Sequence, residues 1–245
     1  MIIAIDGEAS TGKSTQAKKI AKKLNINYRD SGAYYRAITL YLIRNHINPK
    51  EILGEDIFST IDISQKFEND SFSIFLNGED VTSKIRARKV SLNVSEYAKK
   101  SEIRNFVYNL LRKSSKSNSI VIDGRDIGTV VFPDADFKFF LYAIPEIRAQ
   151  RRHKEINDET VKIESIEREI KERDDIDSTR DIAPLIKAED AYGIDVSYLA
   201  IDQVFEEILE KIITEILSIK LLTKRHKYKF VYVILCNKCT ICTLT

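Results

Sequence analysis

The sequence predicts a three-layer α/β fold, in which helices cover both faces of a central parallel five-stranded sheet. Short apolar, β-branched runs alternate along the chain with segments of helical periodicity, which is the pattern of strand, crossover helix and strand. The runs do not alternate between apolar and polar residues, and this is typical of strands buried on both faces. The five predicted strands are residues 2–5, 25–30, 119–123, 137–142 and 193–196.

Helices are predicted between and after these strands. The first covers 13–24, where the apolar residues fall on one face, and a second passes through 38–44. A long charged helical region covers 146–176, and a last helix covers about 201–217. No internal repeat interrupts this order, so the elements read as one α/β unit.

One segment departs from the parallel pattern. Residues 61–86 alternate between apolar and polar positions around an Asn77-Gly78 pair, which favours a tight hairpin turn. The segment is therefore predicted to be a small antiparallel β insertion.

Composition excludes several classes of partner. The 245 residues are 43% apolar and 31% charged, and 39 Lys and Arg against 37 Asp and Glu leave a formal charge of only +2. Such a balance provides no global field for nucleic acid or an anionic membrane. No apolar run of about 20 residues could span a bilayer, no secretion signal is evident, and all three cysteines lie in the last ten residues. We expect a cytoplasmic protein.

The segment GEASTGKS at 7–14 matches the phosphate-loop pattern G-x-x-x-x-G-K-[ST] after a strand and before a helix. Its glycines let the backbone N–H groups point at an anion, Lys13 can reach the β- and γ-phosphates, and the Ser14 hydroxyl can bind Mg²⁺. The predicted nucleotide-binding residues are Gly7, Glu8, Ala9, Ser10, Thr11, Gly12, Lys13, Ser14 and Thr15.

Four further segments contain arginines: DSGAYYRA at 30–37, VIDGRDIGTVVFPDA at 121–135, RAQRR at 148–152 and ERDDIDSTRDIAPL at 172–185. Singly, such charged segments are most often solvated surface. Beside a phosphate loop they supply the cations that phosphoryl transfer needs around the transferred group.

The phosphate loop, these four segments and GEDVTSKIR at 78–86 occur in the order and spacing of bacterial cytidylate kinases, which the chain therefore resembles. Those enzymes transfer the γ-phosphoryl group of ATP to CMP or dCMP in pyrimidine metabolism. The resemblance covers about residues 1–217, and DGRD-x-GTVVFPDA is its most discriminating part. It implies a P-loop NTPase core, a monophosphate-binding insertion at about 61–86 and a helical lid at about 150–182, within a kinase domain of residues 1–219. It also implies ATP and CMP or dCMP as ligands, Mg²⁺ as cofactor and, we expect, a monomer.

Carried onto this chain, the resemblance assigns the acceptor phosphate to Ser31, Arg36, Arg125 and Arg180. It assigns the cytosine base to Ser95, Arg104 and Asp126, and the sugar or lid contacts to Arg173 and Asp177. Cytosine presents acceptors at O2 and N3 and a donor at N4, so an arginine and a carboxylate can read its edge together. Uracil would place a carbonyl oxygen against Asp126 and be rejected.

The catalytic residues expected from this assignment are Lys13, Arg36, Arg125 and Arg180, because an acceptor that is already an oxyanion needs positioning rather than a general base. Asp123 is expected as an outer-shell partner of Mg²⁺. Arg151 and Arg152 are candidates for ATP contact at the base of the lid, with simple solvation as the alternative. Glu8 departs from the family pattern, and we expect its carboxylate to turn outward to solvent.

Two other functions remain open at this point. A kinase of another monophosphate or of a small metabolite would share the loop and the lid, and the pocket around Arg104 and Asp126 is what favours cytosine. A GTP-binding switch would need N-K-x-D, but Asn237-Lys238 is followed by Cys239-Thr240.

The tail, 220–245, lies outside the resemblance and is expected to be a disordered extension. Its three cysteines, Cys236, Cys239 and Cys242, have a spacing that a zinc or iron–sulfur site can also show.

Overall fold

The computed structural model describes residues 1–50, 55–68, 71–115, 119–156, 158 and 160–223. Its centre is a five-stranded parallel sheet in the order β2-β6-β1-β7-β8. The strands are β1 (Ile2–Gly7), β2 (Asn27–Asp30), β6 (Ile120–Gly124), β7 (Phe137–Tyr142) and β8 (Tyr192–Asp195). The predicted parallel five-stranded sheet is confirmed.

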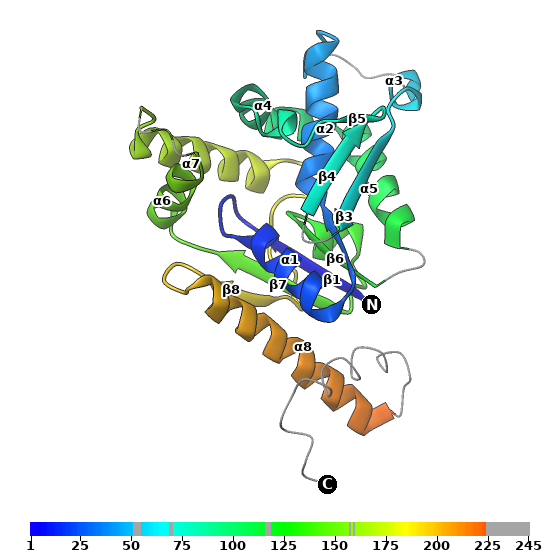
Figure 1. Cartoon of the computed structure of the whole chain (residues 1–245), viewed down its shortest axis with the longest axis vertical. Coiled ribbons are helices and arrows are strands. Elements are labelled where there is room, and N and C mark those ends of the chain that lie inside the picture. Colours follow the sequence, from blue (N-terminus) through cyan, green and yellow to red (C-terminus); the bar gives the residue numbers. More distant parts are fainter. Residues whose placement is uncertain (51–54, 69–70, 116–118, 157, 159, 224–245) are drawn as a thin grey trace.

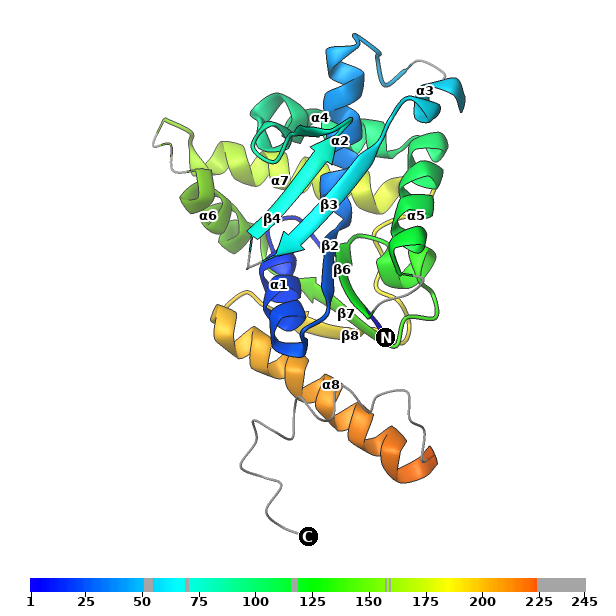
Figure 2. The same cartoon turned by 45° about the vertical axis from the view of Figure 1, so that its right-hand side comes forward.

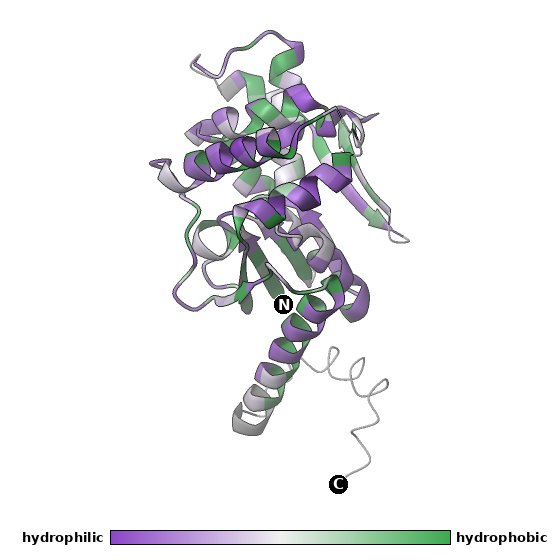
Figure 3. Ribbon diagram, turned by 90° about the vertical axis from the view of Figure 1, so that its left-hand side faces the viewer, coloured by the Kyte–Doolittle hydropathy of each residue, from purple (hydrophilic) through white to green (hydrophobic). Residues whose placement is uncertain are grey.

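Helices cover both faces of this sheet. On one side α1 (Lys13–Leu24) packs against β6 and against α8 (Ile201–Thr223), and on the other lies α5 (Ser101–Ser115), as Figure 2 shows. All five residues of β6 are buried, as a strand covered on both faces requires. In Figure 3 the central strands are hydrophobic, whereas hydrophilic residues dominate the outer surfaces of the helices.

The local sequence explains where α1 begins and ends. Gly12, with φ of 87°, precedes the helix, and Asn25, with φ of 52°, follows it in the left-handed conformation that ends many helices. Lys22 and Lys23 in its last turn face the negative end of the helix dipole. Because Gly12 belongs to the phosphate loop, the helix starts directly at that loop.

The predicted antiparallel insertion is confirmed and consists of β3 (Ile63–Glu68), β4 (Ser71–Leu76) and β5 (Glu79–Asp80). Between β4 and β5 both Asn77 and Gly78 have positive φ, 48° and 81°, as a two-residue hairpin turn of this type requires. Figure 1 shows the insertion at the upper end of the molecule, beside α2 (Ser31–Arg44).

The connection from the insertion back to the sheet is helical. It contains the short helical turn η1 (Lys84–Arg86), α4 (Arg88–Ala98) and then α5, while a short α3 (Glu55–Ser59) precedes β3. The charged helical region predicted over 146–176 consists of two helices, α6 (Pro145–Ile156) and α7 (Ile163–Thr179). The side chain of Asp158 accepts hydrogen bonds from the N–H and hydroxyl of Thr160, which stabilises a turn between them.

These two helices bring a second, small apolar core to the phosphate loop. It consists of Ala9, Ala149, Ile166 and Ile170, so the loop packs directly against α6 and α7. Figure 1 shows both helices beside the loop that precedes α1.

At the other end of the chain, α8 extends to Thr223 and projects beyond the sheet (Figure 1). Residues 224–245, with the three cysteines and the expected disordered extension, lie outside the described residues. Within the part of the chain that is described, no helix combines the length and the apolar character needed to cross a bilayer.

Candidate active site

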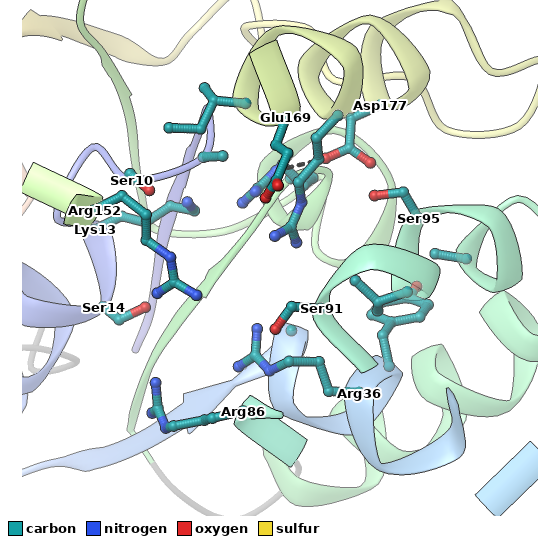
Figure 4. Close-up of a pocket in the computed structure, with 18 of the residues that line it drawn as sticks. Ser10, Lys13, Ser14, Arg36, Arg86, Ser91, Ser95, Arg152, Glu169 and Asp177 are labelled. Atoms are coloured by element: carbon teal, nitrogen blue, oxygen red, sulfur yellow. Dashed lines mark hydrogen bonds and ion pairs between the residues drawn. The ribbon is translucent and has the colours of Figure 1, made fainter. Parts of the chain in front are cut away.

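A cleft of about 820 Å³ opens at the carboxyl edge of the sheet, where ligands bind in open parallel α/β sheets. Its walls come from the phosphate loop, α2, α4, the end of β6 and α7. In Figure 4, Lys13 and Ser14 lie on one side of it and Arg36 and Arg86 on another, with Asp177 on the helix above. The cleft thus connects the phosphate loop with most of the arginine-bearing segments.

The phosphate loop is tightly curled. A Cβ on Gly7, whose φ is 149°, would lie 2.0 Å from the carbonyl oxygen of Leu141, so only glycine fits there. Within the loop, Lys13 Nζ donates to the carbonyl oxygen of Glu8 at 2.8 Å. Burial lowers the pKa of the Lys13 ammonium to about 7, and the charge of Arg125 acts in the same direction. An anion bound in the cleft would favour the charged form of Lys13.

A hydroxyl and a carboxylate lie side by side where the loop enters α1. Ser14 Oγ donates to Asp123 Oδ2 at 2.6 Å, and the hydroxyl of Tyr28 donates to Asp123 Oδ1 at 2.8 Å. Burial and the neighbouring Asp30 raise the pKa of the Asp123 carboxyl to about 6. Oxygen donors of this kind are the ligands that Mg²⁺ prefers, so the residues present fit that ion.

The start of α2 forms the next part of the wall. Asp30 caps this helix by accepting from Ala33 N at 2.8 Å and also pairs with Arg36 Nη2 at 2.9 Å. Ser31 Oγ donates to the carbonyl oxygen of Asp123, and a Cβ on Gly124 would lie 2.6 Å from that hydroxyl oxygen. Ser31 therefore lies next to the end of β6, and Arg36 is held by Asp30 at the end of β2.

Arg125, which follows β6, and Arg180, which follows α7, meet at one carboxylate. Asp177 Oδ2 accepts from Arg125 Nε at 3.0 Å, and its Oδ1 accepts from Arg180 Nη1 at 3.3 Å. Burial alone would raise the pKa of Asp177, but Arg125, Arg173 and Arg180 hold it below its ordinary value. Burial next to Arg125 lowers the pKa of Arg173 to about 10. Asp177 thus fixes the two arginines on either side of it.

Three arginines of the site each have a buried nitrogen without a partner among the described residues. Among the described residues, no acceptor reaches Arg36 Nε, Arg173 Nε or Arg180 Nη2, although all three nitrogens are buried. All three residues line the cleft. Unpaired buried donors are costly, and an anionic ligand would satisfy them.

Arg104 and Asp126 form a buried ion pair at the far end of the cleft. Arg104 is 1% exposed and Asp126 is 2% exposed. Arg104 also donates from Nη1 to the carbonyl of Ala98 at 2.9 Å and stacks near the ring of Tyr35, with 5.5 Å between guanidinium and ring centroid. Ser95 of α4 also lines the cleft. All three residues assigned to the base therefore line this one cleft.

Arg151 and Arg152, the two candidates for ATP contact, lie in different places. Arg152 lines the cleft and points into it (Figure 4). Arg151 is not among the described residues that line it, and its Nη2 donates to the carbonyls of Val196 and Ser197. Glu8 turns away from the cradle, and its side chain is 29% exposed, so it faces solvent only in part. Its Oε2 accepts from Ala143 N at 3.2 Å and lies 3.4 Å from Arg148 Nε.

Sequence reasoning missed three contributors to this site. Arg86, at the end of η1, and Arg88, the first residue of α4, line the cleft, and Arg88 pairs with Glu169 of α7 at 2.6 Å. Tyr108 contacts Asp126 from behind the cleft. Arg86 lies inside the motif at 78–86, and Tyr108 follows Arg104 by one helical turn, so both had a signal in the sequence.

A family model described as cytidylate kinase matches residues 3–214. Among curated proteins the chain is similar to cytidylate kinase of Clostridioides difficile (strain 630), with 46% identity over 217 residues that cover 86% of this chain and 98% of that protein. It is 45% identical over 210 residues to cytidylate kinase of Fervidobacterium nodosum, covering 85% of this chain and 94% of the relative. Cytidylate kinase of Fusobacterium nucleatum is 46% identical over 214 residues, covering 86% and 97%.

Proposed function

The chain belongs to the cytidylate kinase family, and from that premise we propose that it transfers the γ-phosphoryl group of ATP to CMP or dCMP. The products are ADP and CDP or dCDP, which makes the reaction a step of pyrimidine nucleotide metabolism. The observation that carries the proposal is the single cleft that joins a phosphate loop at one end to the buried Arg104–Asp126 pair at the other.

The phosphate loop is the donor end of this cleft. Lys13 would leave the carbonyl of Glu8 to bind the β- and γ-phosphates, and the loop N–H groups would bind the remaining oxygens. Ser14 would hold Mg²⁺, with Asp123 in the outer shell. When bound, the ion neutralises charge on the phosphate oxygens.

Three arginines form the acceptor-phosphate end. Arg36, Arg125 and Arg180 would bind the phosphate of the monophosphate, supported by the spare donors of Arg36 and Arg180 and by Asp177, which holds Arg125 and Arg180. Because the attacking group is already an oxyanion, these cations chiefly offset the repulsion between two anions held in line. The insertion would close on the monophosphate, and the α6–α7 lid would close on ATP and exclude water.

The Arg104–Asp126 pair would select the base. The spare N–H groups of Arg104 can donate to O2 and N3 of cytosine, while a carboxylate oxygen of Asp126 can accept from the N4 amino group. Uracil has a carbonyl oxygen at position 4, and two oxygens with lone pairs would then face each other. The site would therefore favour CMP over UMP.

The test is a panel of monophosphates with ATP and Mg²⁺, in which ADP release is measured for CMP, dCMP, UMP, AMP and GMP. We expect kcat/KM for CMP or dCMP to exceed that for the other three by about 100-fold or more, the size of discrimination that polar base readout supports. A Lys13→Met preparation controls for contaminating kinases. Faster turnover of UMP or of a purine monophosphate would overturn the proposal.

A further inference from the structure

The two carboxylate oxygens of Asp126 have different surroundings. Oδ2 accepts from Arg104 Nη2 at 2.5 Å and from the hydroxyl of Tyr108 at 2.6 Å. No residue within the described ranges donates to Oδ1, and Asp126 lines the cleft. The protein therefore engages one oxygen twice and leaves the other for a ligand.

Tyr108 fixes both members of this pair through a single hydroxyl. It accepts from Arg104 Nε at 2.8 Å, and because arginine can only donate, its one hydrogen goes to Asp126. The hydroxyl thus links the guanidinium and the carboxylate in a closed triangle of hydrogen bonds. Such a network holds each group more firmly than the ion pair alone.

The position of Tyr108 suits it to act from behind the cleft. It follows Arg104 by four residues on α5, so both side chains lie on the same face of the helix. Its ring is 7% exposed and lies between two guanidinium groups, 5.4 Å from that of Arg104 and 5.7 Å from that of Arg112. Tyr108 is not among the described residues that line the cleft. It can orient the base-reading groups without touching the ligand.

We propose that Tyr108 is a positioning residue that determines specificity, because it holds Asp126 with Oδ1 toward the base. The proposal rests on the assignment of Arg104 and Asp126 to the cytosine ring. The side-chain torsion that turns a carboxylate is soft, so an aspartate held by Arg104 alone can rotate away from an approaching carbonyl. The hydroxyl of Tyr108 removes that freedom, and uracil then meets a fixed oxygen that it cannot pair with.

The test is Tyr108→Phe, which deletes only the hydroxyl and keeps the ring between the two arginines. We expect the ratio of kcat/KM for CMP to that for UMP to fall about tenfold, the size typical of a lost hydrogen bond to a charged group. The change should fall on KM for the monophosphates more than on kcat, with KM for ATP unchanged. Tyr97→Phe is the matched control, since it removes another buried hydroxyl, which donates to the carbonyl of Ile47 at 2.7 Å. It should keep the wild-type ratio.

A double-mutant comparison tests whether Tyr108 acts through Asp126. In an Asp126→Ala background, Tyr108→Phe should change the CMP-to-UMP ratio by less than twofold, because the polar group that it positions is gone. An unchanged ratio in the single variant, or equal losses for CMP and UMP, would overturn the role given to Tyr108. If the wild type itself fails to prefer CMP, the proposed function fails instead, and the two failures are distinct.

Discussion

The Glu8 carboxylate lies 3.4 Å from Nε of the buried Arg148, and this contact joins the phosphate loop to α6. Arg148 also donates to the carbonyl of Ala9 at 3.2 Å and pairs with Asp174 of α7. Asp174 in turn accepts from Ala9 N at 3.1 Å. A carboxylate that would repel nucleotide phosphates is therefore held away from them by an arginine.

Glu8→Gln should lower the free energy of unfolding by only about 0.5–1 kcal/mol, because Glu8 is partly exposed and Arg148 keeps Asp174 as partner. Arg148→Met should cost about 3–5 kcal/mol, since it leaves a carboxylate and two carbonyls without their donor. Urea unfolding monitored by circular dichroism measures both. Equal losses would contradict a network centred on Arg148.

Arg125→Ala should reduce kcat/KM for CMP by about 10²–10⁴-fold, because it removes a cation from the transferred group and frees Asp177. The affinity of the free enzyme for ATP should stay nearly unchanged. Steady-state kinetics and ATP titration without acceptor separate the two quantities. Parallel losses would assign Arg125 to the ATP end of the cleft.

Asp126→Asn should shift the preference from CMP toward UMP. Arg104 and Tyr108 both donate to one oxygen of the side chain, so an asparagine would turn its own oxygen toward them. Its amino group would then face the base and donate to the carbonyl at position 4 of uracil. The CMP-to-UMP ratio of kcat/KM should fall by at least about tenfold. A ratio equal to that of the wild type would remove Asp126 from base recognition.

The affinity for ATP should decrease as pH rises above about 7. Burial lowers the pKa of Lys13 to about 7 in the free protein, and bound phosphates favour its charged form. Below this pH the ammonium is already charged, whereas above it binding must take up a proton. Titration calorimetry at pH 8, in buffers that differ in ionisation enthalpy, should show uptake of up to about one proton.

Lys13→Arg is the control for this measurement, because arginine stays protonated and should take up no proton at pH 8. Equal uptake by the variant and the wild type would assign the proton to another group.

A chain that ends at Thr223 should keep full turnover of CMP. The family model ends at residue 214, and the aligned region covers 98% of the relative from Clostridioides difficile. The comparison is kcat/KM for CMP in the shortened and full-length chains, with thermal unfolding as a check on folding. A folded but inactive shortened chain would give the last 22 residues a role in catalysis, because residues 224–245 are the ones removed.

The central sheet could be predicted from the sequence because its signal is local. Short apolar runs such as 120–122 in β6 identify strands buried on both faces, and Asn77-Gly78 identifies a hairpin turn. The boundary between α6 and α7 could not be predicted in the same way. It depends on a turn at Asp158 within a uniformly charged segment, where hydrophobic periodicity is weak.

The positions of the site residues could likewise be predicted only in part. The assigned arginines, Ser95 and Asp126 do meet in one cleft, as their motifs led us to expect, whereas Arg151 reaches backbone carbonyls near the end of β8. Both Arg151 and Arg152 come from the same short run of the sequence. Only the direction in which each leaves α6 separates the residue in the cleft from the one outside it.

By itself the sequence determined the fold class, the phosphate loop and the cations available for phosphoryl transfer, because each depends on residue types within a few positions of one another. Tertiary structure decided how those groups are oriented. Asp177 pairs with Arg125 from 52 positions away, Asp126 pairs with Arg104 from 22, and Glu8 of the phosphate loop pairs with Arg148 of α6. Packing between distant segments decides which carboxylate oxygen of Asp126 is engaged and which arginine nitrogens are left unpaired. No local sequence pattern contains that information.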